Sequence, residues 1–74
     1  MPKYSEYVYT DNLKEARKSK RITAQKMAEL LGLNSKVSYY NIENGETEPR
    51  ITTILEISKI LGKSPSNFFK LKVQ

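Results

Sequence analysis

The stretch TAQKMAELLGLNSKVSYYNIENG, residues 23–45, decides the fold of this chain. Thr23 precedes apolar residues at helical spacing, and its side-chain oxygen can accept a hydrogen bond from an amide that the start of a helix leaves free. The face expected to be buried carries the apolar residues of this helix, Met27, Ala28, Leu30 and Leu31. Gly32 follows, where a left-handed backbone costs glycine little. A first short helix is therefore predicted to end in a tight turn at Gly32.

A second short helix is predicted over about residues 35–44. The polar residues 34–36 supply its cap and first turn, and Tyr39 and Ile42 face inward. Asn44 and Gly45 end it. The opposite face carries side chains that can donate, accept or make apolar contacts: Lys36, Val37, Ser38, Tyr40 and Asn41. Two short helices around a glycine turn have the layout of a helix-turn-helix.

Several segments, in their order and spacing, resemble the lambda-repressor-like proteins, also called the Cro/CI or Xre type. They are residues 13–17 (LKEAR), 27–32 (MAELLG), 42–45 (IENG) with 48–49 (EP), 54–62 (ILEISKILG) and 68–69 (FF). The resemblance covers roughly residues 12–69. It implies an all-α fold, a compact bundle of five helices that contains a DNA-binding helix-turn-helix.

The segment before the motif is predicted to form the first helix of this bundle. It starts near Thr10 or Asp11, with an earlier start at Ser5 left open. It ends around residues 18–20, where cations favour the negative end of the helix dipole. Its buried stripe is expected to contain Tyr9, Leu13 and Ala16.

The segment after the motif completes the scaffold. A helix over residues 51–61 is expected to end at Gly62. Its buried residues are expected to be Ile51, Ile54, Leu55, Ser58 and Leu61. A fifth helix opens with Ser64 as cap and Pro65 at the first position, where the missing amide does no harm. Phe68 and Phe69 then close the core.

The two ends of the chain allow two interpretations. We divide the sequence into an arm (residues 1–9), the helix-turn-helix domain (10–69) and a tail (70–74). Residues 4–9 and 69–74 alternate polar and apolar side chains, which is typical of a strand. They are either a disordered arm and a frayed tail or partners in an intermolecular strand pair. The resemblance supports the second option, since some small Cro-type proteins dimerise through a C-terminal strand. The predicted dimer contacts are then Phe69, Leu71 and Val73.

Charge and composition narrow the function. The 74 residues carry a net charge of +5, and seven basic but only two acidic residues lie between Lys14 and Lys36. Such a concentration suits a phosphate backbone, although basic side chains on small domains also serve solubility. The absence of Cys and His excludes disulfides, Cys/His zinc fingers and catalytic sites that need either residue. We expect that the protein is not an enzyme and that it binds no metal, cofactor or small-molecule ligand. Without a long apolar run, no membrane span is expected and a cytoplasmic location is predicted.

The resemblance also assigns DNA contacts, because the second helix of the motif enters the major groove in this family. It implies that Lys36, Val37 and Asn41 read bases, with Ser38 and Tyr40 beside them. The alternative for Val37 and Tyr40 is packing within the bundle. The phosphate contacts implied are Thr23, Gln25, Ser35, the backbone amides near Asn44, and Arg50.

One expected ion pair serves the fold. In the family, the arginine matching Arg17 pairs with the glutamate matching Glu43.

Three features depart from the family pattern. Ala24 stands where glutamine is usual, the turn at residues 32–35 is one residue longer than the commonest form, and residues 46 and 48 make the following loop acidic. The register of the first contacts of the second helix depends on that turn.

The sequence thus predicts a sequence-specific regulator of transcription that binds an operator in double-stranded DNA. We expect a dimeric repressor of the phage or mobile-element kind, a homodimer at least on DNA. Two alternatives stay open. One is an antitoxin or restriction-modification controller that regulates its own promoter. The other is a protein-interaction module that has lost DNA affinity and uses Tyr4, Tyr7, Tyr9 or the tail.

Overall fold

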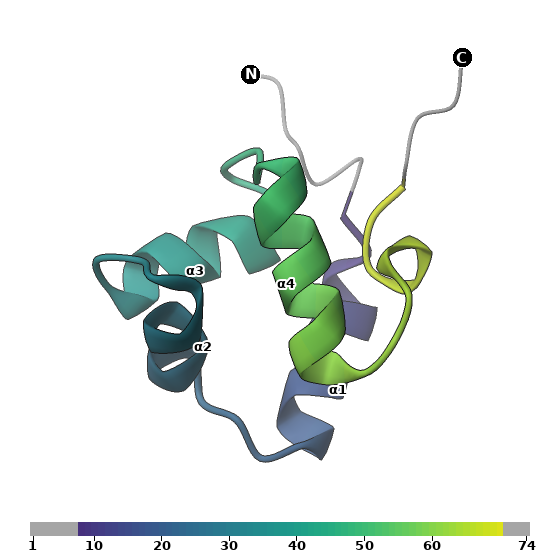
Figure 1. The fold of residues 1–74 in the computed structure, drawn as a ribbon, viewed down its shortest axis with the longest axis horizontal. Coiled ribbons are helices and arrows are strands. Elements are labelled where there is room, and N and C mark those ends of the chain that lie inside the picture. The colour runs from purple at the N-terminus through teal and green to yellow at the C-terminus, as the bar shows by residue number, and fades with distance from the viewer. Residues whose placement is uncertain (1–7, 71–74) are drawn as a thin grey trace.

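The computed structural model describes residues 8–70. These residues form an all-helical bundle in the order α1 (Thr10–Ser19), α2 (Ala24–Leu31), α3 (Lys36–Glu43), α4 (Ile51–Leu61) and η2 (Pro65–Asn67) (Figure 1). The all-α prediction is confirmed. The count of five α-helices is wrong for the described part of the chain, because η2 is a single turn of 3-10 helix. Within the same residues, no helix is both long and apolar enough to cross a membrane.

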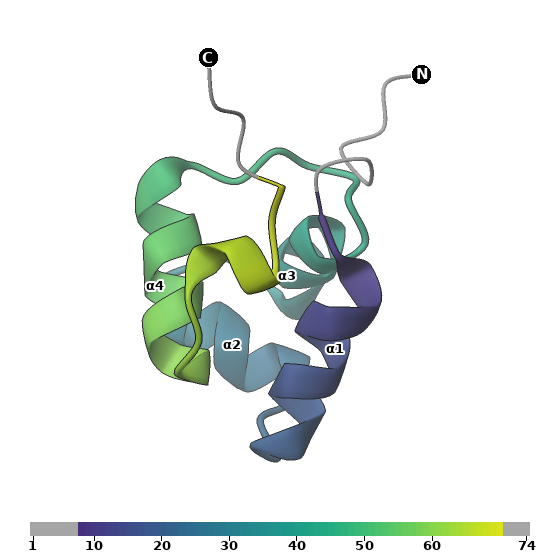
Figure 2. The same ribbon diagram turned by 90° about the vertical axis from the view of Figure 1, so that its right-hand side faces the viewer.

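The helix-turn-helix unit, α2 and α3, lies on one side of the bundle. In Figure 1 these helices occupy the left and α4 the centre, with η2 on the right. Turning the molecule brings η2 and α1 to the front, with α2 behind them (Figure 2). The two faces of the bundle are therefore distinct: one displays α2 and α3, and the other carries η2 and the meeting point of the chain ends.

Thirteen buried apolar residues, drawn from every α-helix and both described ends of the chain, make one core. They are Val8, Leu13, Ala16, Ala24, Met27, Ala28, Tyr39, Ile42, Ile54, Ile57, Leu61, Phe68 and Phe69. This set confirms most of the predicted inward positions. Each helix contributes a stripe with three- and four-residue spacing, as helical periodicity requires.

Four expected core positions are wrong: Tyr9, Leu30, Ile51 and Leu55 are 38%, 48%, 66% and 51% exposed. At 100° per residue, Leu30 lies well off the centre of the stripe that Ala24, Met27, Ala28 and Leu31 form on α2. Leu55 lies likewise off the stripe of α4, which is completed by the fully buried Ile57. Ile51 opens α4 at its outer end, and Val8 takes the core position expected for Tyr9.

The predicted end of α2 at Gly32 is confirmed. Gly32 adopts a left-handed backbone with φ 73°, and the Leu33 amide donates to the Ala28 carbonyl at 2.8 Å. Gly62 ends α4 in the same conformation, with φ 71°. Both turns use the freedom that a residue without Cβ has at positive φ.

The C-terminal segment turns back instead of continuing as a helix. The amides of Phe68 and Phe69 both donate to the Pro65 carbonyl, at 3.0 and 2.9 Å. The chain then forms one antiparallel bridge between Phe69 and Val8, and the Tyr9 amide donates to the Phe68 carbonyl at 2.7 Å. Ser64 occupies the cap position and Pro65 is the first residue of η2, as predicted, but the Ser64 side chain makes no cap hydrogen bond to the backbone.

This arrangement corrects one predicted dimer contact. Phe69 is only 3% exposed and packs in the core of its own chain, so its side chain is not available to a second copy. The other two predicted contacts, Leu71 and Val73, and the arm residues Tyr4 and Tyr7 lie outside the described residues.

Candidate nucleic-acid interface

Two hydroxyl caps fix where α2 and α3 begin. Thr23 Oγ1 accepts from the Lys26 amide at 3.0 Å, and Ser35 Oγ accepts from the Ser38 amide at 3.4 Å. Each bond satisfies an amide that a helix start leaves without a partner. Ser35 is therefore the cap, and α3 starts at Lys36 despite the longer turn.

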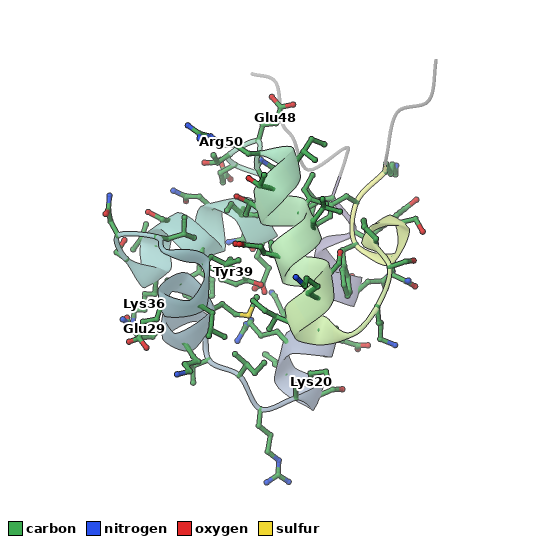
Figure 3. The ribbon with its side chains drawn as sticks, viewed as in Figure 1. Lys20, Glu29, Lys36, Tyr39, Glu48 and Arg50 are labelled. Carbon is green, nitrogen blue, oxygen red and sulfur yellow. The ribbon has the colours of Figure 1, made fainter. Side chains whose placement is uncertain are left out.

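The residues predicted to read bases lie on the outer side of α3. Lys36, Val37 and Tyr40 are exposed, whereas Ser38 and Asn41 are half-buried. Val37 is 59% exposed, so it does not pack within the bundle. Figure 3 shows Lys36 pointing away from the molecule, on the side of the bundle formed by α2 and α3. The start of α3 thus presents an ammonium group and an isopropyl group to solvent.

The residues predicted to contact phosphates differ in their surroundings. Thr23, Gln25, Ser35 and Arg50 are all exposed, and Arg50 directly precedes α4 and points outward (Figure 3). The Thr23 and Ser35 hydroxyls accept from backbone amides, which leaves their hydrogens able to donate. Gln25 Nε2 donates instead to Glu29 Oε2 at 3.4 Å, so a carboxylate lies beside this candidate.

The prediction that backbone amides near Asn44 are available to phosphate is wrong. The amide of Asn44 donates to Tyr40 O at 2.8 Å, and that of Gly45 donates to Ile42 O at 3.2 Å. The next two amides, of residues 46 and 47, both donate to the carbonyl of Asn41, at 2.7 and 3.1 Å. All four donors close the end of α3, so only the exposed side chain of Asn44 remains a candidate contact.

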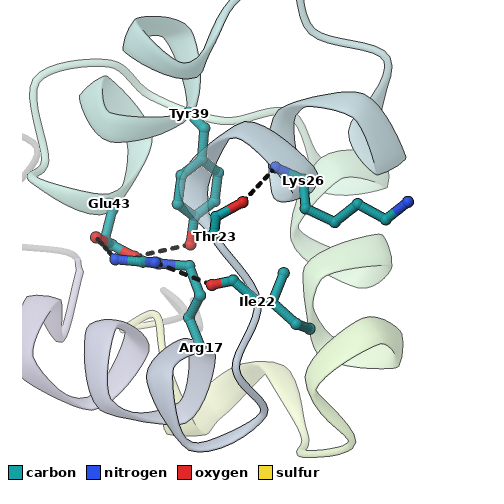
Figure 4. Close-up of polar contacts among 6 residues, drawn as sticks. All are labelled: Arg17, Ile22, Thr23, Lys26, Tyr39 and Glu43. Atoms are coloured by element: carbon teal, nitrogen blue, oxygen red, sulfur yellow. Dashed lines mark hydrogen bonds and ion pairs between the residues drawn. The ribbon is translucent and has the colours of Figure 1, made fainter.

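A buried polar network holds α3 against α1 (Figure 4). Arg17 Nε donates to Glu43 Oε2 at 2.8 Å and Arg17 Nη2 donates to Oε1 at 3.3 Å. The Tyr39 hydroxyl donates to the same carboxylate at 2.9 Å. Arg17 Nη1 donates to the Ile22 carbonyl at 3.0 Å, which ties in the segment before α2. The expected Arg17–Glu43 pair is present, and Glu43 is fully buried.

The Arg17 and Tyr39 donors of the network keep their protons over a wide pH range. The hydrogen bond with Glu43 raises the pKa of the Arg17 guanidinium above its already high ordinary value. Burial, together with the neighbouring Glu43, raises the pKa of the Tyr39 phenol far above its ordinary value. Arg17 therefore stays charged, and Tyr39 stays a protonated donor.

Arg17 also lies near two aromatic rings of α3, the buried ring of Tyr39 and the exposed ring of Tyr40. Its guanidinium carbon lies 5.9 Å from the ring centroids of both Tyr39 and Tyr40, a distance at which a cation attracts an aromatic face. Neither the Tyr39–Glu43 bond nor this contact was predicted from the sequence. The spacing of Tyr39 and Glu43, four residues apart on one helix, was a usable signal.

Comparison with known proteins agrees with this geometry. The Helix-turn-helix family profile matches residues 13–68. The chain is 40% identical over 57 residues to an uncharacterized HTH-type transcriptional regulator, YqaE, of Bacillus subtilis (strain 168), covering 77% of this chain and 48% of that protein. A second B. subtilis protein, the SPbeta prophage-derived uncharacterized HTH-type transcriptional regulator YonR, is 35% identical over 63 residues, or 85% and 57% of the two chains.

The chain spans about half the length of these two relatives. The fold is similar to that of the restriction-modification controller protein C.AhdI from Aeromonas hydrophila, with a TM-score of 0.67 and 24% identity, covering 78% of this chain and 86% of that one. The capped α2–α3 unit, the ion pair and the family match together identify the chain as a member of the helix-turn-helix family of the Cro/CI (Xre) type.

Proposed function

We propose that this protein is a sequence-specific regulator of transcription that inserts α3 into the major groove of double-stranded DNA. The observation that carries the proposal is the exposed outer side of α3 at Lys36, Val37 and Tyr40, while the Arg17–Glu43 pair holds the buried side of the same helix. In this pose Lys36 donates to guanine O6 and N7, Asn41 pairs with adenine N6 and N7, and Val37 contacts a thymine methyl.

Backbone contacts position the helix in the groove without reading sequence. Arg50 lies directly before α4 and its guanidinium is exposed. This group can donate two parallel hydrogen bonds to a phosphate. The hydroxyls of Thr23 and Ser35 donate to further phosphates at the starts of α2 and α3, where the helix dipole favours anions. Gln25 contributes less than its position indicates, because Glu29 accepts its amide hydrogen.

We further propose that the protein is a homodimeric repressor of the phage or mobile-element type. A single α3 reads a few base pairs, whereas two copies on related half-sites, ~34 Å apart, double the readout. The acidic residues 46 and 48 in the loop after α3 weaken the attraction of one copy to phosphates, which favours binding in pairs. The relation to a protein named as prophage-derived supports the phage type.

The salt dependence of duplex binding tests the proposal. The affinity should fall steeply as salt rises, with a slope near −0.9 for each phosphate neutralised. Arg50→Ala should reduce that slope by about one and weaken all sequences alike. Lys70→Ala is the matched control, because it removes an exposed cation that lies outside α2 and α3, with its Nζ 5.6 Å from the ring centroid of Tyr9. A chain that binds no duplex at low salt would refute the proposal and favour the protein-interaction module.

A further inference from the structure

The connection between α1 and α2 contains an arginine in a conformation suited to glycine. The Arg21 amide donates to the Lys18 carbonyl at 2.9 Å, and the Ile22 amide donates to the Arg17 carbonyl at 3.1 Å. These two bonds form a Schellman motif, whose residue after the helix cap takes a left-handed backbone and is usually glycine. Here that residue is Arg21, with φ 59°.

At the other left-handed positions, the residue is the usual glycine. The other positive-φ residues within the described part of the chain are Gly32, Gly45 and Gly62. A left-handed backbone costs a residue with a Cβ conformational energy that glycine avoids. Arg21 is exposed, and among residues 8–70 its guanidinium makes no hydrogen bond or ion pair. Nothing within these residues offsets the cost of placing arginine at this position.

The position of Arg21 is nevertheless firmly fixed. The carbonyl of the next residue, Ile22, accepts from Arg17 Nη1 at 3.0 Å, so the turn is tied to the buried ion pair. The side chain of Ile22 packs against the core. Thr23, the cap of α2, follows directly (Figure 4). Arg21 is therefore held two residues from a predicted phosphate contact.

The stretch of chain around Arg21 carries only positively charged side chains. Residues 16–28 contain five basic and no acidic side chains. Lys18 and Lys20 are exposed on the same turn. An anion is the ligand that such a segment attracts, and a guanidinium matches phosphate oxygens with two parallel donors.

We propose that Arg21 is a DNA-phosphate contact at the outer edge of the interface, and that this role maintains arginine at a position where glycine would be more stable. The proposal rests on the function proposed above. It extends the backbone footprint beyond α2 into the preceding turn. Because the contact is to phosphate, it adds affinity and leaves sequence preference unchanged.

The replacement Arg21→Gly tests this inference, because the proposal predicts effects of opposite sign. Relief of the left-handed strain should raise the Tm by about 2–6 °C, as expected for a small gain in a domain of this size. Loss of the contact should weaken binding to a random-sequence duplex and to any preferred duplex by the same factor. It should also reduce the salt slope by ~0.9.

Two further variants isolate the charge. Arg21→Lys should keep the salt slope, because an ammonium also neutralises one phosphate. Lys70→Ala removes an exposed cation outside α2 and α3 and should leave the slope unchanged. Full binding by Arg21→Gly, when Arg50→Ala weakens binding, would overturn the inference while the proposed function stands. A lower Tm together with weaker binding would assign Arg21 a structural role and also overturn it. Failure of the wild type to bind any duplex would overturn both.

Discussion

Removing Arg17 should destabilise this domain more than any surface change. In Arg17→Ala, the Glu43 carboxylate stays fully buried and loses both guanidinium bonds, at 2.8 and 3.3 Å. Only the Tyr39 hydroxyl remains as its donor among the bonds of the network. Breaking a buried pair on one side costs about 3–5 kcal/mol, because the surviving charge is stranded.

That cost is large for a chain of this size. Stabilities of roughly 0.05–0.15 kcal/mol per residue give this chain ~4–11 kcal/mol in total. A loss of 3 kcal/mol or more lowers the Tm of such a domain by at least about 12 °C. Thermal unfolding followed by circular dichroism measures the shift. Lys18→Ala is the matched control, because it removes one exposed positive charge from the next position of α1 and should change stability by less than about 0.5 kcal/mol. An Arg17→Ala variant as stable as Lys18→Ala would refute the reasoning.

The pKa of Tyr39 is raised in the folded state. The contribution of the Tyr39 phenol to stability is therefore present below about pH 10, the ordinary tyrosine value, and is lost as the pH rises further. Tyr39→Phe should reduce this alkaline loss of stability, which urea unfolding across pH measures. Gly32→Ala should lower stability by ~1 kcal/mol through backbone strain alone, since a Cβ there meets no atom within 4 Å; an unchanged Tm would contradict the left-handed turn. Ile57→Ala, at a fully buried position, should cost about 2–5 kcal/mol and Leu55→Ala, at a half-exposed one, much less; equal costs would show that the assigned face of α4 is wrong.

Element boundaries were predictable because the signals that set them are local. A hydroxyl at Thr23 or Ser35 and a glycine at Gly32 or Gly62 act on amides and carbonyls within a few residues. Helical periodicity likewise located most of the core. These features require no knowledge of which helix packs on which.

The errors arose where tertiary packing decides. Leu30 and Leu55 are apolar and lie beside buried stripes, but their side chains are 48% and 51% exposed. Phe69 was assigned to a dimer contact, whereas pairing with Val8 turns its side chain into the core. An alternating pattern shows that a segment is strand-like but does not show which partner it meets.

The candidate site likewise contains some features that local sequence patterns predict and others that depend on tertiary contacts. The outward face of α3 followed from spacing, whereas Arg17 and Glu43, 26 residues apart, were paired only through the family resemblance. The backbone amides after α3 were expected to be free, but the chain folds back onto the Asn41 carbonyl. Periodicity within a single helix contains no information about that return.

Selection of bound sequences from a random pool of duplexes tests the central claim, that α3 reads DNA, most directly. The wild type should enrich one site with two related halves about one helical turn apart. Asn41→Ala should enrich a site that has lost preference at one base position in each half and is otherwise the same. No enriched sequence, or identical sites for the two proteins, would contradict the assignment of α3 as the reading helix.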